Sequence, residues 1–135
     1  MIGVIVVTHG MFGKELIGSF NMITGAQEKL SSLSLLDGDD VSELADQISE
    51  LAQEMDDGEG VLVLVDIFGG SPCNSASRLL MRDDIAVEVV AGVNLPMLIK
   101  VTESRNSVGL KRLAEVAVSS VAEYTFDVRE QLQHM

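Results

Sequence analysis

A histidine and an aspartate in this chain each follow a run of apolar, β-branched residues. His9 comes shortly after Ile2–Val7, and Asp66 comes directly after Val61–Val65. A carboxylate that accepts the hydrogen of one imidazole nitrogen fixes the tautomer and stabilises the imidazolium form, which leaves the other nitrogen as a nucleophile or base. The only other histidine, His134, lies next to the end of the sequence. His9 is therefore the first candidate for a catalytic residue, with Asp66 as the residue that orients it.

A glycine-rich segment, Gly69 and Gly70 followed by Ser71, lies just beyond the aspartate. Glycines let the backbone approach a ligand closely. Ser71 before Pro72 is typical of a helix start with serine at the N-cap, and the N–H groups at a helix start favour an anion. Together with the histidine, this segment favours a phosphoryl group as the anion, because phosphoryl transfer mainly requires in-line positioning and charge stabilisation. The plainer alternatives stay open, with Asp66 as a loop cap and Ser71 as an N-cap only.

Short β-branched runs alternate with segments in which apolar residues recur at helical spacing. Strands are expected at Ile2–Val7, Leu30–Leu36, Val61–Val65 and Ala86–Ala91, and helices at Gly13–Ile23, after Asp40, after Ser71, after Gly92–Pro96 and at Ser107–Ala122. This alternation predicts an α/β fold, a small doubly wound parallel sheet in the order 2-1-3-4 with helices on both faces. Such sheets bind ligands at the carboxyl ends of the strands, where the order reverses between strands one and three. His9 and Asp66 end those two strands, so we expect them to meet.

Composition and charge narrow the class of protein. The 135 residues are enough for one domain, 1–135. Nine basic against twenty-one acidic residues give a net charge of −12, which disfavours nucleic acid as a partner. Cys73 is the only cysteine, which excludes an intramolecular disulfide, and the apolar N-terminal run is too short for a signal peptide or a membrane span. These features favour a cytoplasmic protein. One histidine and one carboxylate fall short of a metal site.

Receiver domains offer a rival interpretation of Asp66. In those domains, of similar topology, an aspartate at the end of the third strand is the phosphate acceptor. They also need acidic residues after the first strand to hold magnesium, and here that position reads "THG". The missing carboxylates argue against a receiver domain.

Three segments in this order, "VTHG", "VDIFGGSPCNSASR" and "AGVNLPML", resemble the mannose-family IIA component of the bacterial phosphoenolpyruvate-dependent sugar phosphotransferase system. The resemblance implies that His9 carries a phosphoryl group, received from phospho-HPr and delivered to a histidine on a IIB protein. Asp66 matches the residue that hydrogen-bonds the active histidine. Thr8 matches the residue before the histidine, and Gly69–Ser71 match the loop that closes on the phosphate. No cofactor is held permanently in this family.

The resemblance also implies a homodimer in which a C-terminal antiparallel strand is exchanged onto the partner's sheet. Tyr124–Val128 is the segment expected in that role, and a frayed tail is the plainer alternative. Apolar residues near the strand ends fit a protein-docking surface, although at least half of them are expected to belong to the core: Met11, Phe12, Ile67, Phe68, Leu95 and Met97. Any association with a membrane permease would be peripheral.

Several roles fit the same residues. Many family members continue into a IIB domain, whereas this sequence ends at Met135, so we expect a stand-alone IIA protein that serves sugar uptake through a separate IIB protein. The alternative is a regulatory module whose His9 phosphorylation gates binding to another protein. The phosphoryl donor component of dihydroxyacetone kinase ranks third, because "GGSP" would not be expected there. A plain anion-binding domain would never form a covalent phosphate.

Overall fold

A computed structural model describes residues 1–135. Its centre is a sheet of four strands that are all parallel, β1 (Gly3–His9), β2 (Leu30–Leu35), β3 (Val61–Val65) and β4 (Val87–Ala91). The strand order is β2-β1-β3-β4, which confirms the order predicted from the sequence. The central pair is in register from Gly3 opposite Val61 to Val7 opposite Val65. The carboxyl ends of β1 and β3 therefore lie at the same edge of the sheet.

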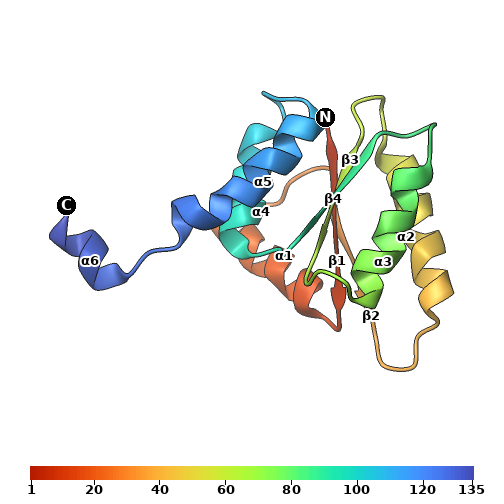
Figure 1. Ribbon diagram of the computed structural model, residues 1–135, viewed down its shortest axis with the longest axis horizontal. Coiled ribbons are helices and arrows are strands. Elements are labelled where there is room, and N and C mark those ends of the chain that lie inside the picture. The colour runs from red at the N-terminus through yellow and green to blue at the C-terminus, as the bar shows by residue number, and fades with distance from the viewer.

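Helices cover both faces of the sheet (Figure 1). On one face lie α1 (Phe12–Thr24), α4 (Leu95–Ser104) and α5 (Leu110–Tyr124), and on the other lie α2 (Val41–Met55) and α3 (Ser71–Ser77), which continues into a 3₁₀ turn at Arg78–Met81. A final helix, α6 (Val128–Gln133), stands away from the sheet. None of these helices combines the length and the apolar character needed to cross a membrane.

The two faces of the sheet form two separate apolar cores. Side chains of β1 alternate between them, with Val4 and Val6 under α1, α4 and α5, and Ile5 and Val7 under α2 and α3. Every residue of β3 is buried. Continuous apolar runs of this kind are typical of parallel strands covered on both faces, which is why the sequence shows the two central strands so clearly.

The C-terminal segment differs from the sequence prediction. Tyr124–Val128 is not a strand, because α5 continues to Tyr124 and α6 begins at Val128. The Asp127 carboxylate accepts a hydrogen bond from the Glu130 backbone N–H at 3.1 Å and so caps α6. The backbone between the two helices is extended at Thr125 and Asp127, and α6 begins only after the Asp127 N-cap. Within one chain, no strand lies beside it to supply the hydrogen bonds that a β-conformation would need.

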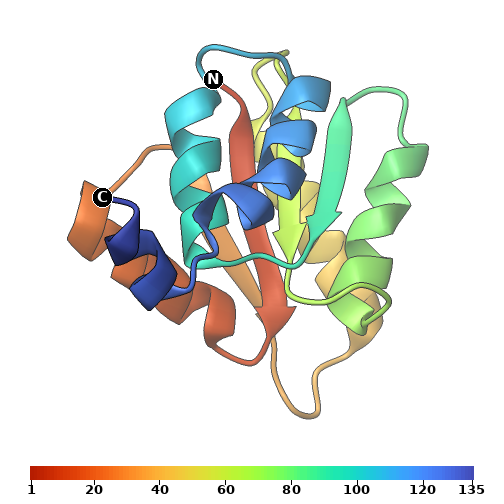
Figure 2. The ribbon, with the colours of Figure 1, turned by 60° about the vertical axis from the view of Figure 1, so that its left-hand side comes forward.

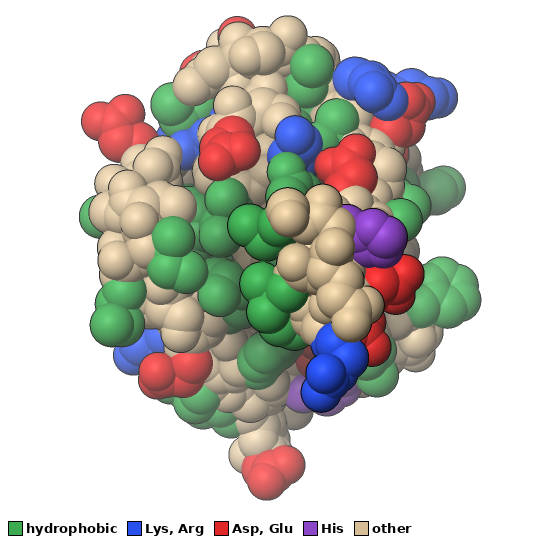
Figure 3. Space-filling view, turned by 90° about the vertical axis from the view of Figure 1, so that its left-hand side faces the viewer, with side chains coloured by type: hydrophobic (Ala, Val, Ile, Leu, Met, Phe, Trp, Pro, Cys, Tyr) green, Lys and Arg blue, Asp and Glu red, His purple; other side chains and the backbone are tan.

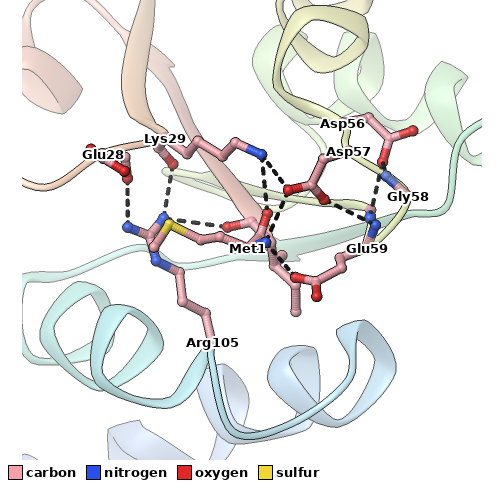
Figure 4. Close-up of polar contacts among 10 residues, drawn as sticks. Met1, Glu28, Lys29, Asp56, Asp57, Gly58, Glu59 and Arg105 are labelled. Atoms are coloured by element: carbon pink, nitrogen blue, oxygen red, sulfur yellow. Dashed lines mark hydrogen bonds and ion pairs between the residues drawn. The ribbon is translucent and has the colours of Figure 1, made fainter.

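The amino ends of the strands are tied together by one buried side chain, Arg105, at the end of α4 (Figure 4). Its Nη1 donates to the carbonyl oxygens of Ile2 at 3.3 Å and Lys29 at 2.9 Å, and its Nη2 donates to that of Glu28. Burial lowers the pKa of the guanidinium, but an arginine keeps its charge in a protein. Lys29 in turn pairs with Asp57 at 2.7 Å. These contacts hold together the segments at the amino ends of the strands, opposite the end of the sheet that carries His9.

Candidate functional site

The structure brings His9 and Asp66 into contact, although they lie 57 positions apart. His9 Nδ1 lies 2.8 Å from Asp66 Oδ2, and the His9 backbone N–H donates to the same oxygen at 2.9 Å. The second carboxylate oxygen, Oδ1, accepts from the Ile67 backbone N–H at 3.0 Å. Because Asp66 is the first residue beyond β3, its carboxylate accepts the backbone hydrogen bond of His9 where the β1–β3 ladder stops. The fold that ends the two strands therefore also assembles the pair.

Asp66 is held in its charged form. Its partial burial would raise the pKa of the carboxyl, but hydrogen bonds from the His9 backbone, the His9 ring and the Ile67 backbone leave that pKa below its ordinary value. An ionised carboxylate can only accept hydrogen bonds, so His9 Nδ1 carries a hydrogen, and in the neutral imidazole Nε2 then holds the free lone pair. The His9 side chain is 47% exposed and that of Asp66 14%. The imidazole of the pair is thus open to solvent, while the carboxylate is mostly covered.

The loop after Asp66 turns through two glycines with different backbone conformations. Gly69 has a φ of +86°, the left-handed region that favours glycine, whereas Gly70 has an ordinary φ of −79°. Gly70 is the N-cap of α3, since its carbonyl oxygen accepts from the Asn74 N–H at 2.9 Å. The prediction of Ser71 as the N-cap is therefore wrong by one residue: Ser71 is already helical. Its half-buried hydroxyl makes no hydrogen bond within the chain.

Thr8 lies outside this cluster. Its side chain is fully buried, and Oγ1 accepts a hydrogen bond from the Gly13 backbone N–H at 2.8 Å. No side chain at the N-cap residue Met11 caps α1, so the Thr8 hydroxyl does so from the neighbouring strand. Alternation along β1 puts Thr8 and His9 on opposite faces of the sheet. That periodicity, already visible in the sequence, indicates that the Thr8 side chain points away from a ligand on His9.

Exposed apolar side chains surround His9. Of the six residues considered for docking, Met11, Phe12, Ile67 and Phe68 are exposed, Phe68 at 89%. Met97 is only 1% exposed and belongs to the core, where Leu95 also packs. The sequence analysis missed Leu36, which is exposed and lines a hollow of about 380 Å³ beside His9 together with Gly10, Leu35 and Asp37–Asp39. An apolar rim with acidic residues beside it is suited to contact with a protein.

Comparison with known proteins identifies the family. A model of the mannose-type EIIA family, described as "PTS system fructose IIA component", matches residues 3–118. The chain therefore belongs to this family of phosphotransferase-system IIA components. This confirms the resemblance noted for the three sequence segments.

Individual relatives agree with the family assignment. The mannose-specific EIIAB component of Escherichia coli (strain K12) is 35% identical over 105 residues, which are 78% of this chain and 32% of the relative. The chain thus spans about a third of the length of these EIIAB relatives. The fructose-specific EIIA component of Bacillus subtilis (strain 168) is 35% identical over 113 residues, 84% of this chain and 77% of the relative.

Solved structures show the same fold over nearly the whole chain. The phosphotransferase-system component EIIA of Streptococcus agalactiae superposes with a TM-score of 0.88 at 27% identity, covering 96% of this chain and 99% of that one. A IIA protein associated with the fucose utilization operon of Streptococcus pneumoniae has a TM-score of 0.78 at 31% identity, with 96% and 95% covered. Both coverages are larger than the share of the chain that the family model matches.

Proposed function

We propose that this chain is a phosphohistidine carrier, in which His9 Nε2 receives a phosphoryl group from phospho-HPr and passes it to a histidine of a IIB protein for sugar uptake. One observation supports this most strongly. The hydrogen bond between Nδ1 of the half-exposed His9 and the charged Asp66 commits that nitrogen, so Nε2 is left with a lone pair facing solvent. Membership in the IIA family gives this arrangement its reaction class.

The proposed transfer requires one bond to form and one to break. The Nε2 lone pair attacks the phosphorus atom, and the bond between phosphorus and the donor's histidine nitrogen breaks with its electron pair returning to that nitrogen. The hydrogen on Nδ1 stays with His9, and the Asp66 carboxylate stabilises the positive charge that develops on the ring. Passage to the IIB histidine repeats the same exchange in the other direction. No cofactor takes part in this scheme.

The backbone of the loop after Asp66 is proposed to contact the phosphate oxygens. Gly70 packs against His9, with Gly69 before it and Ser71, the first residue of α3, after it. Thr8 has a different proposed role, because its hydroxyl is committed to the Gly13 N–H. It holds the turn between His9 and α1, and so positions the nucleophile without touching the phosphate.

The partners follow from the family and from the surface around His9. Several relatives, one of them in Escherichia coli (strain K12), are named mannose-specific EIIAB components, which supports a IIB protein as the recipient. The exposed Met11, Phe12, Ile67 and Phe68 provide an apolar surface for HPr and for IIB in turn, and the net charge of −12 would speed encounter with a basic-faced donor. The named relatives serve mannose, fructose and sorbose systems, and we assign no sugar to this chain. We place the carrier in the cytoplasm, where its donor would be met.

The C-terminal arm, residues 125–135 after α5, supports a homodimer as part of this proposal. Strand β4 lies at an open edge of the sheet, and a groove of about 440 Å³ runs between Glu88–Val90 and α5. Phe126, Val128 and Leu132 are exposed on the arm, and hydrophobic side chains line the hollow beside it (Figure 3). We propose that the arm of each chain covers the apolar surface of its partner and that Tyr124–Val128 lies along the partner's β4. Light scattering that finds only monomers at micromolar concentration would contradict the dimer.

Phosphoryl transfer to the wild type, His9→Ala and His134→Ala proteins tests the carrier. With phosphoenolpyruvate, enzyme I and HPr, we expect a label that is labile in acid and stable in alkali in the wild type and in His134→Ala, and absent from His9→Ala. His134→Ala is the matched control because it removes the only other histidine. A label that survives in His9→Ala, or that alkali removes, would place the acceptor elsewhere. If no protein is labelled although the donors are active, the carrier proposal fails, and a domain that binds anions without phosphoryl transfer is the alternative that stands.

A chase of the labelled protein with a IIB protein separates a carrier from a regulatory module. Rapid loss of the label to IIB is expected of a carrier. A label that stays on His9 in the presence of IIB, while phosphorylation changes binding to another protein, would favour the regulatory role.

A further inference from the structure

Gly70 packs directly against the His9 imidazole. A Cβ atom built on Gly70 would lie 2.8 Å from His9 Cε1, and its next neighbours would be Ile67 Cγ1 at 3.3 Å and Ile67 Cδ1 at 3.4 Å. A carbon atom this close to the ring carbon would overlap with it, so any side chain at position 70 would force the ring or the loop to move.

Position 70 requires a glycine because a side chain would not fit there, and not because of the backbone conformation. Gly70 has φ −79° and ψ 172°, extended values that any residue adopts. Its neighbour Gly69 is the opposite case, with a φ of +86° and no atom within 4 Å of where its Cβ would lie. The turn therefore requires a glycine at 69, whereas only the imidazole requires one at 70.

The contact is with Cε1, the ring atom that lies between the two nitrogens. Cε1 is bonded to Nδ1 and to Nε2, so a push on Cε1 displaces the nitrogen bound to Asp66 and the proposed nucleophile together. Asp66 holds the ring at Nδ1 through a 2.8 Å hydrogen bond, and the bare Cα of Gly70 limits the ring on the Cε1 side. The Ile67 side chain closes the space next to Gly70, while its N–H donates to Asp66. The loop 66–70 thus holds the imidazole by a hydrogen bond on one side and by packing on the other.

We propose that Gly70 is a positioning residue for His9, and that its lack of a side chain is what allows Nδ1 to reach Asp66 with Nε2 directed outward. The kinetic part of this inference rests on the proposed phosphocarrier function, but the structural part does not. It assigns Gly70 a role toward the imidazole that is distinct from any contact it makes with a phosphate.

Gly70→Ala tests the proposal, and Gly18→Ala in α1 is the matched control because nothing lies within 4 Å of a Cβ there. Long-range ¹H–¹⁵N spectra of His9 report which ring nitrogen carries the hydrogen. We expect the Nδ1–H form in the wild type and in Gly18→Ala, and a shift toward the Nε2–H form in Gly70→Ala. At saturating phospho-HPr, the transfer rate of Gly70→Ala should fall about 10- to 100-fold with KM nearly unchanged. An unaltered tautomer, or a rate within twofold of the wild type, would overturn the proposal.

A double-mutant cycle in thermal stability tests the contact independently of phosphoryl transfer. Gly70→Ala should lower Tm in the presence of His9 but leave it almost unchanged in a His9→Ala background, since the clashing ring is gone. An equal loss of Tm in both backgrounds would refute the contact, even if the variant folds poorly. If the wild type accepts no phosphoryl group but the cycle shows coupling, the proposed function fails and the positioning role stands.

Discussion

One oxygen atom of Asp66 performs two tasks. Oδ2 accepts the backbone N–H of His9 and also lies 2.8 Å from its ring Nδ1, so the same atom ends the strand ladder and sets the tautomer. Both contacts therefore depend on the position of this one oxygen, whereas the stabilisation of the ring also depends on its negative charge.

Asp66→Asn should keep the fold and slow phosphoryl transfer by about 100-fold or more. An amide oxygen in the place of Oδ2 can still accept from the His9 backbone N–H and from the ring, but the negative charge that stabilises the ring is lost, and the amide NH₂ then faces the Ile67 N–H, which is also a donor. Rapid-quench measurement of uptake from phospho-HPr gives the rate, and circular dichroism reports the fold. Asp37→Asn is the control, because Asp37 lines the hollow beside His9 without bonding to it. Unfolding of Asp66→Asn would show that Asp66 is chiefly structural.

The His9–Asp66 pair could be predicted from the sequence, because it needs only two strand ends and the rule that parallel strands end at one edge. The Gly70 contact could not. It depends on the direction of a Cα–Cβ bond at a loop end, which no spacing of residue types reveals. The sequence also predicts the N-cap of α3 at Ser71, one residue after the actual N-cap, Gly70. Serine and glycine both occur at N-caps, so residue type alone does not choose between them.

At the scale of elements, β1 and α1 are joined by a hydrogen bond from α1 to a side chain of β1. Thr8 Oγ1 accepts from the Gly13 N–H at 2.8 Å, and a Cβ on Gly13 would lie 3.1 Å from that oxygen. The helix start is thus fitted closely onto the strand that ends in His9. The turn between them, Gly10 and Met11, has little freedom to move the histidine.

Thr8→Val should destabilise the protein by about 1–3 kcal/mol, because the valine keeps the shape but leaves the buried Gly13 N–H without an acceptor. Thr8→Ser retains the hydroxyl and should lose less. Urea unfolding gives both values, and hydrogen exchange at the Gly13 amide should quicken in Thr8→Val alone. Equal stability of the two variants would mean that the methyl group matters and the hydrogen bond does not.

The C-terminal arm shows where element prediction reached its limit. Tyr124–Val128 is rich in residues that favour strands, yet Tyr124 ends α5, Val128 begins α6, and the three residues between them connect the two helices. A short segment of this composition adopts a strand only where an edge strand pairs with it, and in one chain the segment does not pair with either edge of the sheet. In contrast, β1 and β3 could be predicted from the sequence alone, because strands buried on both faces appear there as continuous apolar runs.

At the scale of the whole molecule, the chemistry and the cross-links are at opposite ends of the sheet. His9 and Asp66 lie at the carboxyl ends of the strands, while Arg105 and the Lys29–Asp57 pair lie at the amino ends (Figures 2 and 4). Variants at the second end should therefore change stability without altering the chemistry at His9.

The pH dependence of stability should reflect the Lys29–Asp57 pair. The Lys29 hydrogen bond, first among several causes, holds the pKa of Asp57 well below its usual value. A folded-state pKa below the unfolded one means that the unfolded chain binds more protons, so this stabilisation is present above about pH 4 and is lost as the pH falls through the folded pKa. Urea unfolding between pH 7 and pH 2 should show Asp57→Asn less stable than the wild type at pH 7, with the difference shrinking in acid. A difference that is constant with pH would exclude the ion pair as its cause.

The buried Arg105 also bears on the order in which the chain folds. Its guanidinium joins α4 to carbonyl groups that lie 103 and 77 positions earlier in the sequence. A contact across such long separations carries a high loop-closure entropy until the sheet has brought the segments together. We therefore expect it to be absent from the folding transition state, so that it slows unfolding but does not speed folding. Folding and unfolding rates measured separately for an Arg105→Lys variant would show the change in the unfolding rate.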